Sequence, residues 1–221
     1  VLAAKGDLFK IGVTPFAGLT TTAFLQRHPL NALVQCGVAA PSTATRLFKY
    51  SITGAAATPT SLVEALCRRT DLEGVRLYHL HTSGPCPFVD PEQEGRLISV
   101  SLFGGAHVRK PIAEGRAEFV PVFLSDIPVL FATRRIPLDV ALVQVSPPDE
   151  HGNCTLGTSV DAAKAATETA RIVIAEINEQ MPRTHGNSVV KLDRIDAFIL
   201  TDRPLYETEP GEQTEVELRI G

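Results

Sequence analysis

The chain has 221 residues, of which 44% are hydrophobic and 21% are charged, a balance typical of a folded globular protein. Its formal net charge is -4, and no stripe of Lys and Arg is interleaved with aromatic residues, which argues against nucleic acid as a partner. No apolar run approaches the roughly 18 residues of a membrane-spanning helix, so we expect no membrane partner.

The first part of the chain is poor in acidic residues. Residues 1–63 contain one acid, Asp7, and are rich in Ala, Thr and Leu with a few basic residues. This composition resembles that of an organelle transit peptide, which would place the protein in mitochondria. A transit peptide and a disordered extension are two open interpretations of residues 1–49. We expect the folded domain to span residues 50–221.

From residue 50 onward, short β-branched runs alternate with helical patterns. A first strand at 50–53 leads into the small-residue turn 54–60, where Thr58 before Pro59 suits a helix N-cap. The start of that helix would favour binding of an anion. The alternative is that the small residues of the turn only allow the strand and the helix to pack closely. Further strands are predicted at 75–80, 97–102, 119–122, 138–145, 171–176 and 198–200. Helices are predicted at 60–69, 108–115, 126–132 and 158–169.

The order of these elements predicts the fold class. Strands that alternate with helices favour an α/β fold with a mostly parallel sheet and helices on both faces. The runs at 138–145 and 171–175 are nearly all apolar, as expected of central strands buried on both faces. Ligands of such sheets bind outside the carboxyl ends of the strands, so the loops there are the place to look for function.

The cysteines do not form a metal-binding or redox motif. Asp149, His151 and Cys154 lie close together, but no second ligand pair stands elsewhere at a suitable spacing, and we predict no metal site. The four cysteines are scattered and are expected to be reduced thiols: Cys36, Cys67, Cys86 and Cys154.

The loop 145–157 follows a buried strand and is dense in turn-forming residues. Two prolines fix its backbone and two glycines release it, so its polar groups are held at fixed positions. Ser146, His151 and Gly152 are therefore candidate ligand-binding residues. The alternative is a rigid crossover whose polar side chains only satisfy backbone donors, and the chemistry alone leaves both open.

The residues of this loop carry a specific resemblance. The segment 146–157, SPPDEHGNCTLG, resembles the motif S-P-P-D-x-H-G-x-x-S-L-G of the acetyl-CoA hydrolase/4-hydroxybutyrate CoA-transferase family. Segments 115–125, 138–142, 175–178, 181–184 and 202–205 follow in the family's order and spacing. The resemblance covers about residues 53 to 210, and that many ordered motifs indicate homology.

The resemblance implies a class I CoA-transferase fold, in which two similar α/β domains hold the active site between them. It implies transfer of CoA between an acyl-CoA and a small carboxylate through a glutamyl-CoA thioester, or release of CoA to water. Coenzyme A would be bound as the thioester substrate, with no permanently bound cofactor. The full-length protein would act in acetyl-CoA or acetate metabolism and form a homo-oligomer.

In the family, the catalytic glutamate lies in the second domain. We therefore expect this chain to be the N-terminal domain, with the C-terminal catalytic domain absent, no catalytic residue of its own and no turnover alone. Glu64, Glu150 and Glu176 do not lie in the nucleophile motif. Glu176 and Asn178 shape the substrate pocket or brace the proline-containing loop, and both roles stay open. A non-catalytic binding module is the alternative from another functional class.

A second candidate site follows the strand at 97–102. Gly104, Gly105 and Arg109 resemble the family's G-P-N-x-R turn, with His107 in place of the Asn. The resemblance puts them near a substrate carboxylate or a CoA phosphate, since a guanidinium suits such anions. The alternative is a surface loop in which Arg109 has no ligand.

Overall fold

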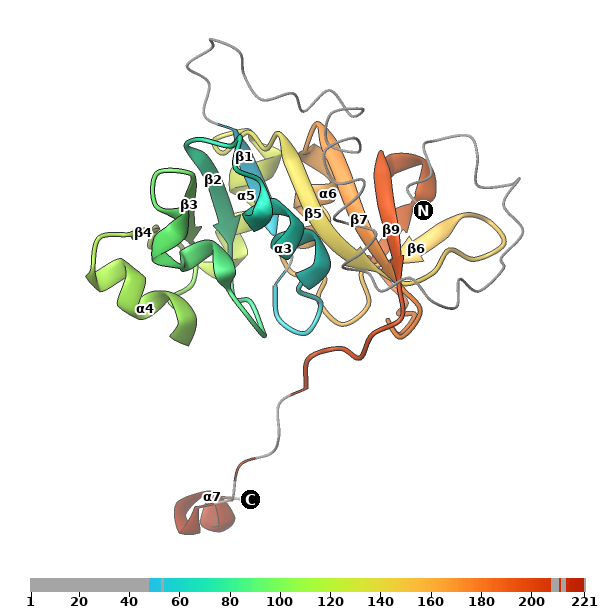
Figure 1. Cartoon of the computed structure of the whole chain (residues 1–221). Helices are drawn as coiled ribbons and strands as arrows, with labels where there is room; N and C mark the ends of the chain where they lie inside the picture. The colour runs from blue at the N-terminus through green and yellow to red at the C-terminus, as the bar shows by residue number, and fades with distance from the viewer. Residues whose placement is uncertain (1–47, 53, 208–210, 212–213, 221) are drawn as a thin grey trace.

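The computed structural model describes residues 48–52, 54–207, 211 and 214–220. Its main element is a seven-stranded sheet of order β4-β3-β2-β1-β5-β7-β9, in which every neighbouring pair is parallel (Figure 1). Its strands are β1 (Lys49–Ile52), β2 (Val75–His79), β3 (Leu97–Ser101), β4 (Ala117–Phe119), β5 (Val140–Val145), β7 (Ile172–Asn178) and β9 (Ala197–Thr201).

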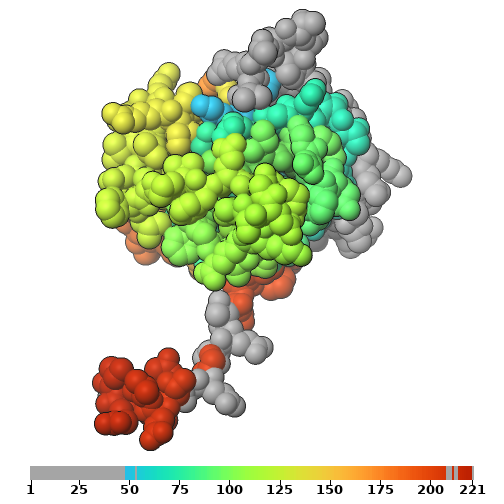
Figure 2. All heavy atoms as spheres, turned by 90° about the vertical axis from the view of Figure 1, so that its left-hand side faces the viewer, coloured from blue at the N-terminus to red at the C-terminus, as the bar shows by residue number. Residues whose placement is uncertain are grey.

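Helices cover both faces of this sheet (Figure 1). Helix α3 (Thr60–Arg68) packs on one face, and α5 (Ile127–Ala132) and α6 (Ala163–Thr169) pack on the other. Helix α4 (Ala106–Ala113) lies at the β4 flank, which faces the viewer in Figure 2. The predicted α/β class, with a mostly parallel sheet and helices on both faces, is confirmed.

The two faces of the sheet form two hydrophobic clusters. In β5, Val140 and Leu142 belong to the cluster under α3, and Ala141, Val143 and Val145 belong to the cluster under α5 and α6. This division follows from the period of two in a strand, and it explains why the run is apolar on both faces apart from Gln144. Each fully buried Val or Leu stabilises the fold by about 1.5–3 kcal/mol.

Beside the main sheet lies a small antiparallel one. Strand β6 (Asn153–Thr155) lies in the loop after β5 and pairs with β8 (Val189–Lys191), which follows β7. Sequence patterns predicted neither strand. The described residues also contain four 3₁₀ segments: η1 (Pro87–Val89), η2 (Pro91–Gln93), η3 (Leu124–Asp126) and η4 (Leu192–Arg194).

Three local predictions are wrong in detail. The strand predicted at 119–122 covers Ala117–Phe119, because Pro121 has no N–H with which to continue the ladder. The helix predicted from residue 158 begins at Ala163, since Asp161 first accepts the N–H of Ala163 in a turn. Thr58 does not cap α3; its hydroxyl donates to the carbonyl of Ala55.

The rest of the described chain is the short helix α7 (Glu215–Ile220), none of whose residues is buried. It begins with a capping box, in which the amide and hydroxyl of Thr214 donate to Glu217 and the Glu217 amide donates back to the Thr214 hydroxyl. Within the described residues, no helix has the length and apolarity that crossing a membrane requires. The extension predicted at residues 1–49 lies outside the described residues, except for 48 and 49, and stays a prediction.

Candidate functional site

The order of the strands indicates where a ligand can bind at the carboxyl edge of the sheet. The chain runs outward from β1 through β2 and β3 to β4, and then returns to place β5 on the other side of β1. In open parallel sheets, ligands bind at such a switch point, outside the carboxyl ends of the two central strands. Here the switch point lies between the loops that follow β1 and β5.

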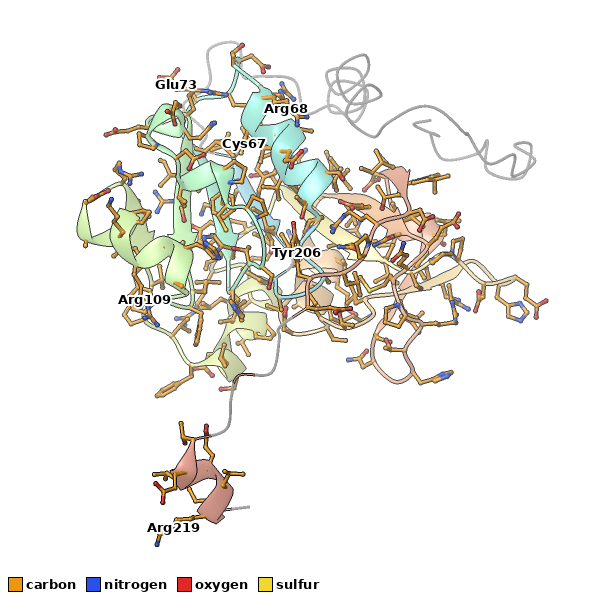
Figure 3. The ribbon with its side chains drawn as sticks, turned by 60° about the horizontal axis from the view of Figure 1, so that its bottom comes forward. Cys67, Arg68, Glu73, Arg109, Tyr206 and Arg219 are labelled. Atoms are coloured by element: carbon orange, nitrogen blue, oxygen red, sulfur yellow. The ribbon has the colours of Figure 1, made fainter. Side chains whose placement is uncertain are left out.

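One group of predicted site residues lies on the β3 side of this edge. Gly105 immediately precedes α4, and the Nε of Arg109 donates to the carbonyl oxygen of Gly104 at 3.0 Å. Figure 3 shows Arg109, a residue of α4, at the flank of the molecule. A Cβ added to Gly104 would meet nothing within 4 Å, so the turn leaves open space for a ligand. Within the described residues, no other hydrogen bond of the Arg109 guanidinium was found.

The second group follows β5, where Ser146 is part of the loop's own scaffold. Its side chain is buried, and its hydroxyl oxygen accepts from the amide of Thr155 at 2.9 Å and from the Thr155 hydroxyl at 3.1 Å. The Ser146 hydroxyl donates to the carbonyl oxygen of Pro147. Its hydrogen-bonding groups therefore join β5 to β6 and hold the loop's shape.

Asp149 organises the tip of the same loop. Its carboxylate accepts from the backbone amides of Asn153 and His151, from the Asn153 side chain and from Arg183 at 2.6 Å. The bonds from Asn153 are the main reason why the pKa of Asp149 is lowered to about 2. This ionised carboxylate fixes the loop, as the density of turn-forming residues suggested.

The remaining two predicted residues are at the exposed tip. The side chain of His151 is 74% exposed, with its Nε2 3.5 Å from the Oε1 of Glu150. Gly152 has a φ of 71°, in the left-handed region that favours glycine. Of the predicted loop residues, His151 is therefore the one whose side chain is open to a ligand.

The structure does not bring the two groups together. Both lie at the carboxyl edge of one sheet, but β2 and β1 separate β3 from β5. Three strand spacings of about 4.8 Å put the strand ends roughly 14 Å apart. A single small ligand cannot contact both groups, whereas a long molecule can.

On the β5–β9 side of the same edge lies a buried polar cluster that the sequence did not single out as a unit. Gln144, Glu176, Asn178 and Thr201 stand at the carboxyl ends of β5, β7 and β9, and all four are buried. Arg203, two residues after β9, donates from Nε to Glu176 at 2.5 Å. Sequence reasoning left Glu176 and Asn178 between two roles, and their bonds run to Arg203 and Gln144 instead of the proline-containing loop.

The three glutamates that were excluded as nucleophiles have different environments. Glu176 is fully buried, and burial raises its pKa while Arg203 opposes that shift. Glu64 pairs with Arg68 at 3.0 Å on the exposed side of α3. Glu150 is exposed at the loop tip. None of the three combines an accessible carboxylate with fixed donors for a developing oxyanion.

The other residues considered for chemistry have structural surroundings. His79 is buried, with its Nε2 2.9 Å from the hydroxyl of Ser99, and burial lowers its pKa to about 4. Cys154 is fully buried and burial raises its pKa to about 12, whereas the nearby His151 points to solvent. In the ranges that the structure describes, no three His, Cys, Asp or Glu residues form a metal-binding group.

Fold and edge together define an open α/β domain whose polar loops gather at the carboxyl ends of a parallel sheet. A family model described as "Acetyl-CoA hydrolase/transferase N-terminal domain" matches residues 43–205. The chain belongs to this family, as the ordered motifs predicted.

Similar proteins are CoA transferases. The "Succinyl-CoA:acetate/propanoyl-CoA:succinate CoA transferase" of Fasciola hepatica is 42% identical over 173 residues, 77% of this chain and 36% of the relative. The "4-hydroxybutyrate coenzyme A transferase" of Clostridium kluyveri is 38% identical over 164 residues, 74% of this chain and 38% of the relative. The chain thus spans little more than a third of the length of these relatives.

Solved structures show the same fold. A 4-hydroxybutyrate CoA-transferase from Porphyromonas gingivalis is 30% identical with a TM-score of 0.62, covering 80% of this chain and 40% of that chain. RipA from Yersinia pestis is 27% identical with a TM-score of 0.71, covering 79% of this chain and 43% of that chain. Each match leaves more than half of the solved chain without a counterpart here.

Proposed function

We propose that this chain is the N-terminal domain of an acyl-CoA:carboxylate CoA-transferase. The observation that carries the proposal is the family membership over residues 43–205, together with relatives that each move CoA to or from a carboxylic acid. The named acids range from acetate and succinate to 4-hydroxybutyrate and cyclohexane-1-carboxylate. Their common chemistry is exchange of a thioester between two carboxylates, and coenzyme A enters as substrate.

The proposed role of this domain is to supply one wall of the site, while the catalytic glutamate comes from a second domain. The environments of Glu64, Glu150 and Glu176 support this division, since none offers an accessible, oriented nucleophile. We expect residues 1–221 alone to show no CoA transfer. Turnover by the purified chain at a rate comparable to a complete transferase would overturn this part of the proposal.

The whole activity is tested on the polypeptide encoded by the complete gene. The enzyme is incubated with acetyl-CoA and a panel of carboxylates, and the new acyl-CoA is followed by mass spectrometry. Formation of the acceptor's CoA thioester supports the transferase. Release of free CoA without acceptor product would instead favour an acetyl-CoA hydrolase, the second activity in the family's description. A gene without a further domain, and no turnover, would favour the binding module.

For the β3 turn, we propose that Arg109 binds a phosphate of CoA or the carboxylate of the acceptor, beside Gly104 and Gly105. Arg109→Gln should weaken binding of one substrate about tenfold or more, because a hydrogen bond to a charged group contributes about 1.5–3 kcal/mol. Lys110→Gln is the matched control, since Lys110 is 83% exposed on the same helix, with its Nζ 3.7 Å from the Oε1 of Glu114. Equal KM values for both variants and the parent would leave Arg109 a surface residue.

For the β5 loop, we propose that His151 contacts the ligand while Ser146 and Gly152 maintain the loop's shape. The exposure of His151 and the internal bonds of Ser146 support this division. His151→Ala should raise KM with little change in thermal stability. Ser146→Ala should lower stability, because the amide and hydroxyl of Thr155 lose their acceptor. The opposite pattern would refute the division.

We further propose a mitochondrial location and a homo-oligomeric full-length enzyme. The acid-poor composition of residues 1–63 supports import. Incubation of the full-length precursor with isolated mitochondria should yield a protease-protected, shortened product, and a precursor that stays outside would refute import. Light scattering of the complete protein measures the oligomer.

A further inference from the structure

The crevice at the switch point is filled by the chain itself. The segment Asp202–Tyr206, here called the strap, leaves β9 at the carboxyl edge and crosses toward the start of α3. The Arg203 guanidinium donates to Glu176 and, from its terminal nitrogen, to the carbonyl oxygen of Thr58 at 2.7 Å. Figure 3 shows Tyr206 near the middle of this edge.

The polar cluster is built to receive this strap. The Asn178 side chain accepts from the Arg203 amide at 3.2 Å and donates to the Arg203 carbonyl oxygen at 2.9 Å. It also donates to Gln144, whose own amide nitrogen donates to Thr58. The backbone of the strap is therefore held from β7, and its guanidinium from β7 and the loop after β1.

The start of α3 was one of the anion sites considered from the sequence, and in the structure the Glu176 carboxylate occupies it. The amide of Ser61 donates to the Oε2 of Glu176 at 3.2 Å, so an internal carboxylate lies where a ligand anion would approach the helix dipole. Because Arg203 neutralises that carboxylate, the crevice holds a matched pair of opposite charges and offers no net charge to a ligand.

The far end of the strap, Tyr206, contacts α3 and the loop after β2. The Tyr206 hydroxyl lies 2.9 Å from that of Thr60, and its ring lies against Gly84, in the loop after β2. Gly84 has a φ of 77°, and a Cβ there would fall well under 3.0 Å from the ring atoms. The strap thus bridges the loops after β1 and β2, across the mouth of the switch-point crevice.

We infer that Arg203 is a positioning residue that locks the strap into the switch-point crevice, so that ligands bind outside the strap and not between β1 and β5. This inference does not depend on which reaction the complete protein catalyses, because it concerns contacts within the described chain. It assigns ligand contact to the flanking loops, which contain Arg109 and His151, and to the exposed side of the strap.

The test is native-state proteolysis of residues 1–221 with chymotrypsin, reading the fragment that ends at Tyr206 by mass. Variant E176Q/R203M removes both charges of the pair, so that the fold is not weakened by an unpaired ion. It should release the strap and speed cleavage after Tyr206 at least tenfold, with unchanged far-UV circular dichroism. E176Q alone keeps the Arg203 contacts to Thr58 and Asn178 but removes the partner charge, and should give a rate between those of the parent and the double variant.

The matched control is R183M, which removes the ion pair between Arg183, after β7, and Asp149, in the loop after β5, without touching the strap. It should leave cleavage after Tyr206 unchanged. Equal cleavage of E176Q/R203M and the parent, or equal acceleration by R183M, would overturn the inference. Hydrogen exchange provides a test without variants: the Arg203 amide of the parent should be protected, and exchange at the rate of an unstructured peptide would also overturn it.

Discussion

Replacing Arg203 by Met should make the stability of this domain strongly dependent on pH. The parent buries the Glu176 carboxylate completely and compensates it with Arg203, whose side chain is 22% exposed. Removing one partner of a buried pair costs about 3–5 kcal/mol, because the other charge is left without compensation. We expect R203M to approach that loss at neutral pH, a large share of the stability of a typical domain.

The pH dependence follows from the direction of the Glu176 pKa. Burial raises this pKa and Arg203 is the first influence that lowers it, so the variant's folded pKa rises further. Well below about pH 4.3 the carboxyl is protonated in both the folded and the unfolded state, and the variant there loses the least stability relative to the parent. As the pH rises above about 4.3, the unfolded state ionises while the folded state keeps its proton. Stability then falls by about 1.4 kcal/mol per pH unit until the folded pKa is reached.

The assay is urea unfolding followed by far-UV circular dichroism at pH 5, 6, 7 and 8, since the chain contains no Trp for fluorescence. The difference between parent and R203M should widen with pH. The double variant E176Q/R203M should show no such trend, because it has no carboxylate at that position. A difference that stays constant over this range, or a double variant as unstable as R203M at pH 8, would refute the argument.

Two further predictions concern the loop after β5. Gly157→Ala should destabilise by about 2–5 kcal/mol, because its Cβ would collide with the Met181 side chain in addition to adopting a left-handed backbone, whereas Gly95→Ala should cost only the roughly 1–2 kcal/mol of that backbone. Chemical unfolding compares the two, and equal losses would contradict the steric argument. The contribution of Asp149 to loop order should be complete above about pH 4 and lost as the pH falls through about 2, since its pKa is lowered in the folded state. Hydrogen exchange at the Asn153 amide measures it, and D149N should remove the dependence in that range.

The sequence predicted those parts of the fold whose signals are local. The buried runs of β5 and β7 and the helical spacing of α3 were located within a few residues, since one apolar pattern decides each. Strands β6 and β8 were missed because three residues are too few to show a period of two. Their pairing depends on a loop that returns more than 30 residues later.

The candidate site was less predictable, and its buried part shows why. The resemblance placed Arg203 and Glu176 in separate motifs, and only the fold brings them within hydrogen-bonding distance. The bond from Arg203 to Thr58 joins residues 145 positions apart. A pattern read along the chain has no signal at that separation, because the contact depends on the strand order and not on nearby residues. The sequence does contain one indication of the cluster, which is the change of polarity along two strands. On the α3 face, β5 and β7 are apolar up to their last residues, which are Gln144, Glu176 and Asn178.

That change of polarity also explains how one face of the sheet both packs against α3 and holds the strap. Near its amino ends the face packs against α3 through Val140, Leu142 and Ile174 and supplies stability. At its carboxyl ends, buried amides and a carboxylate would each cost free energy without partners, so the strap is required to satisfy them. The folded domain is thereby tied to the course of the chain beyond β9. The strands that carry the two groups of loop residues end roughly 14 Å apart, so contact with both groups requires an elongated ligand.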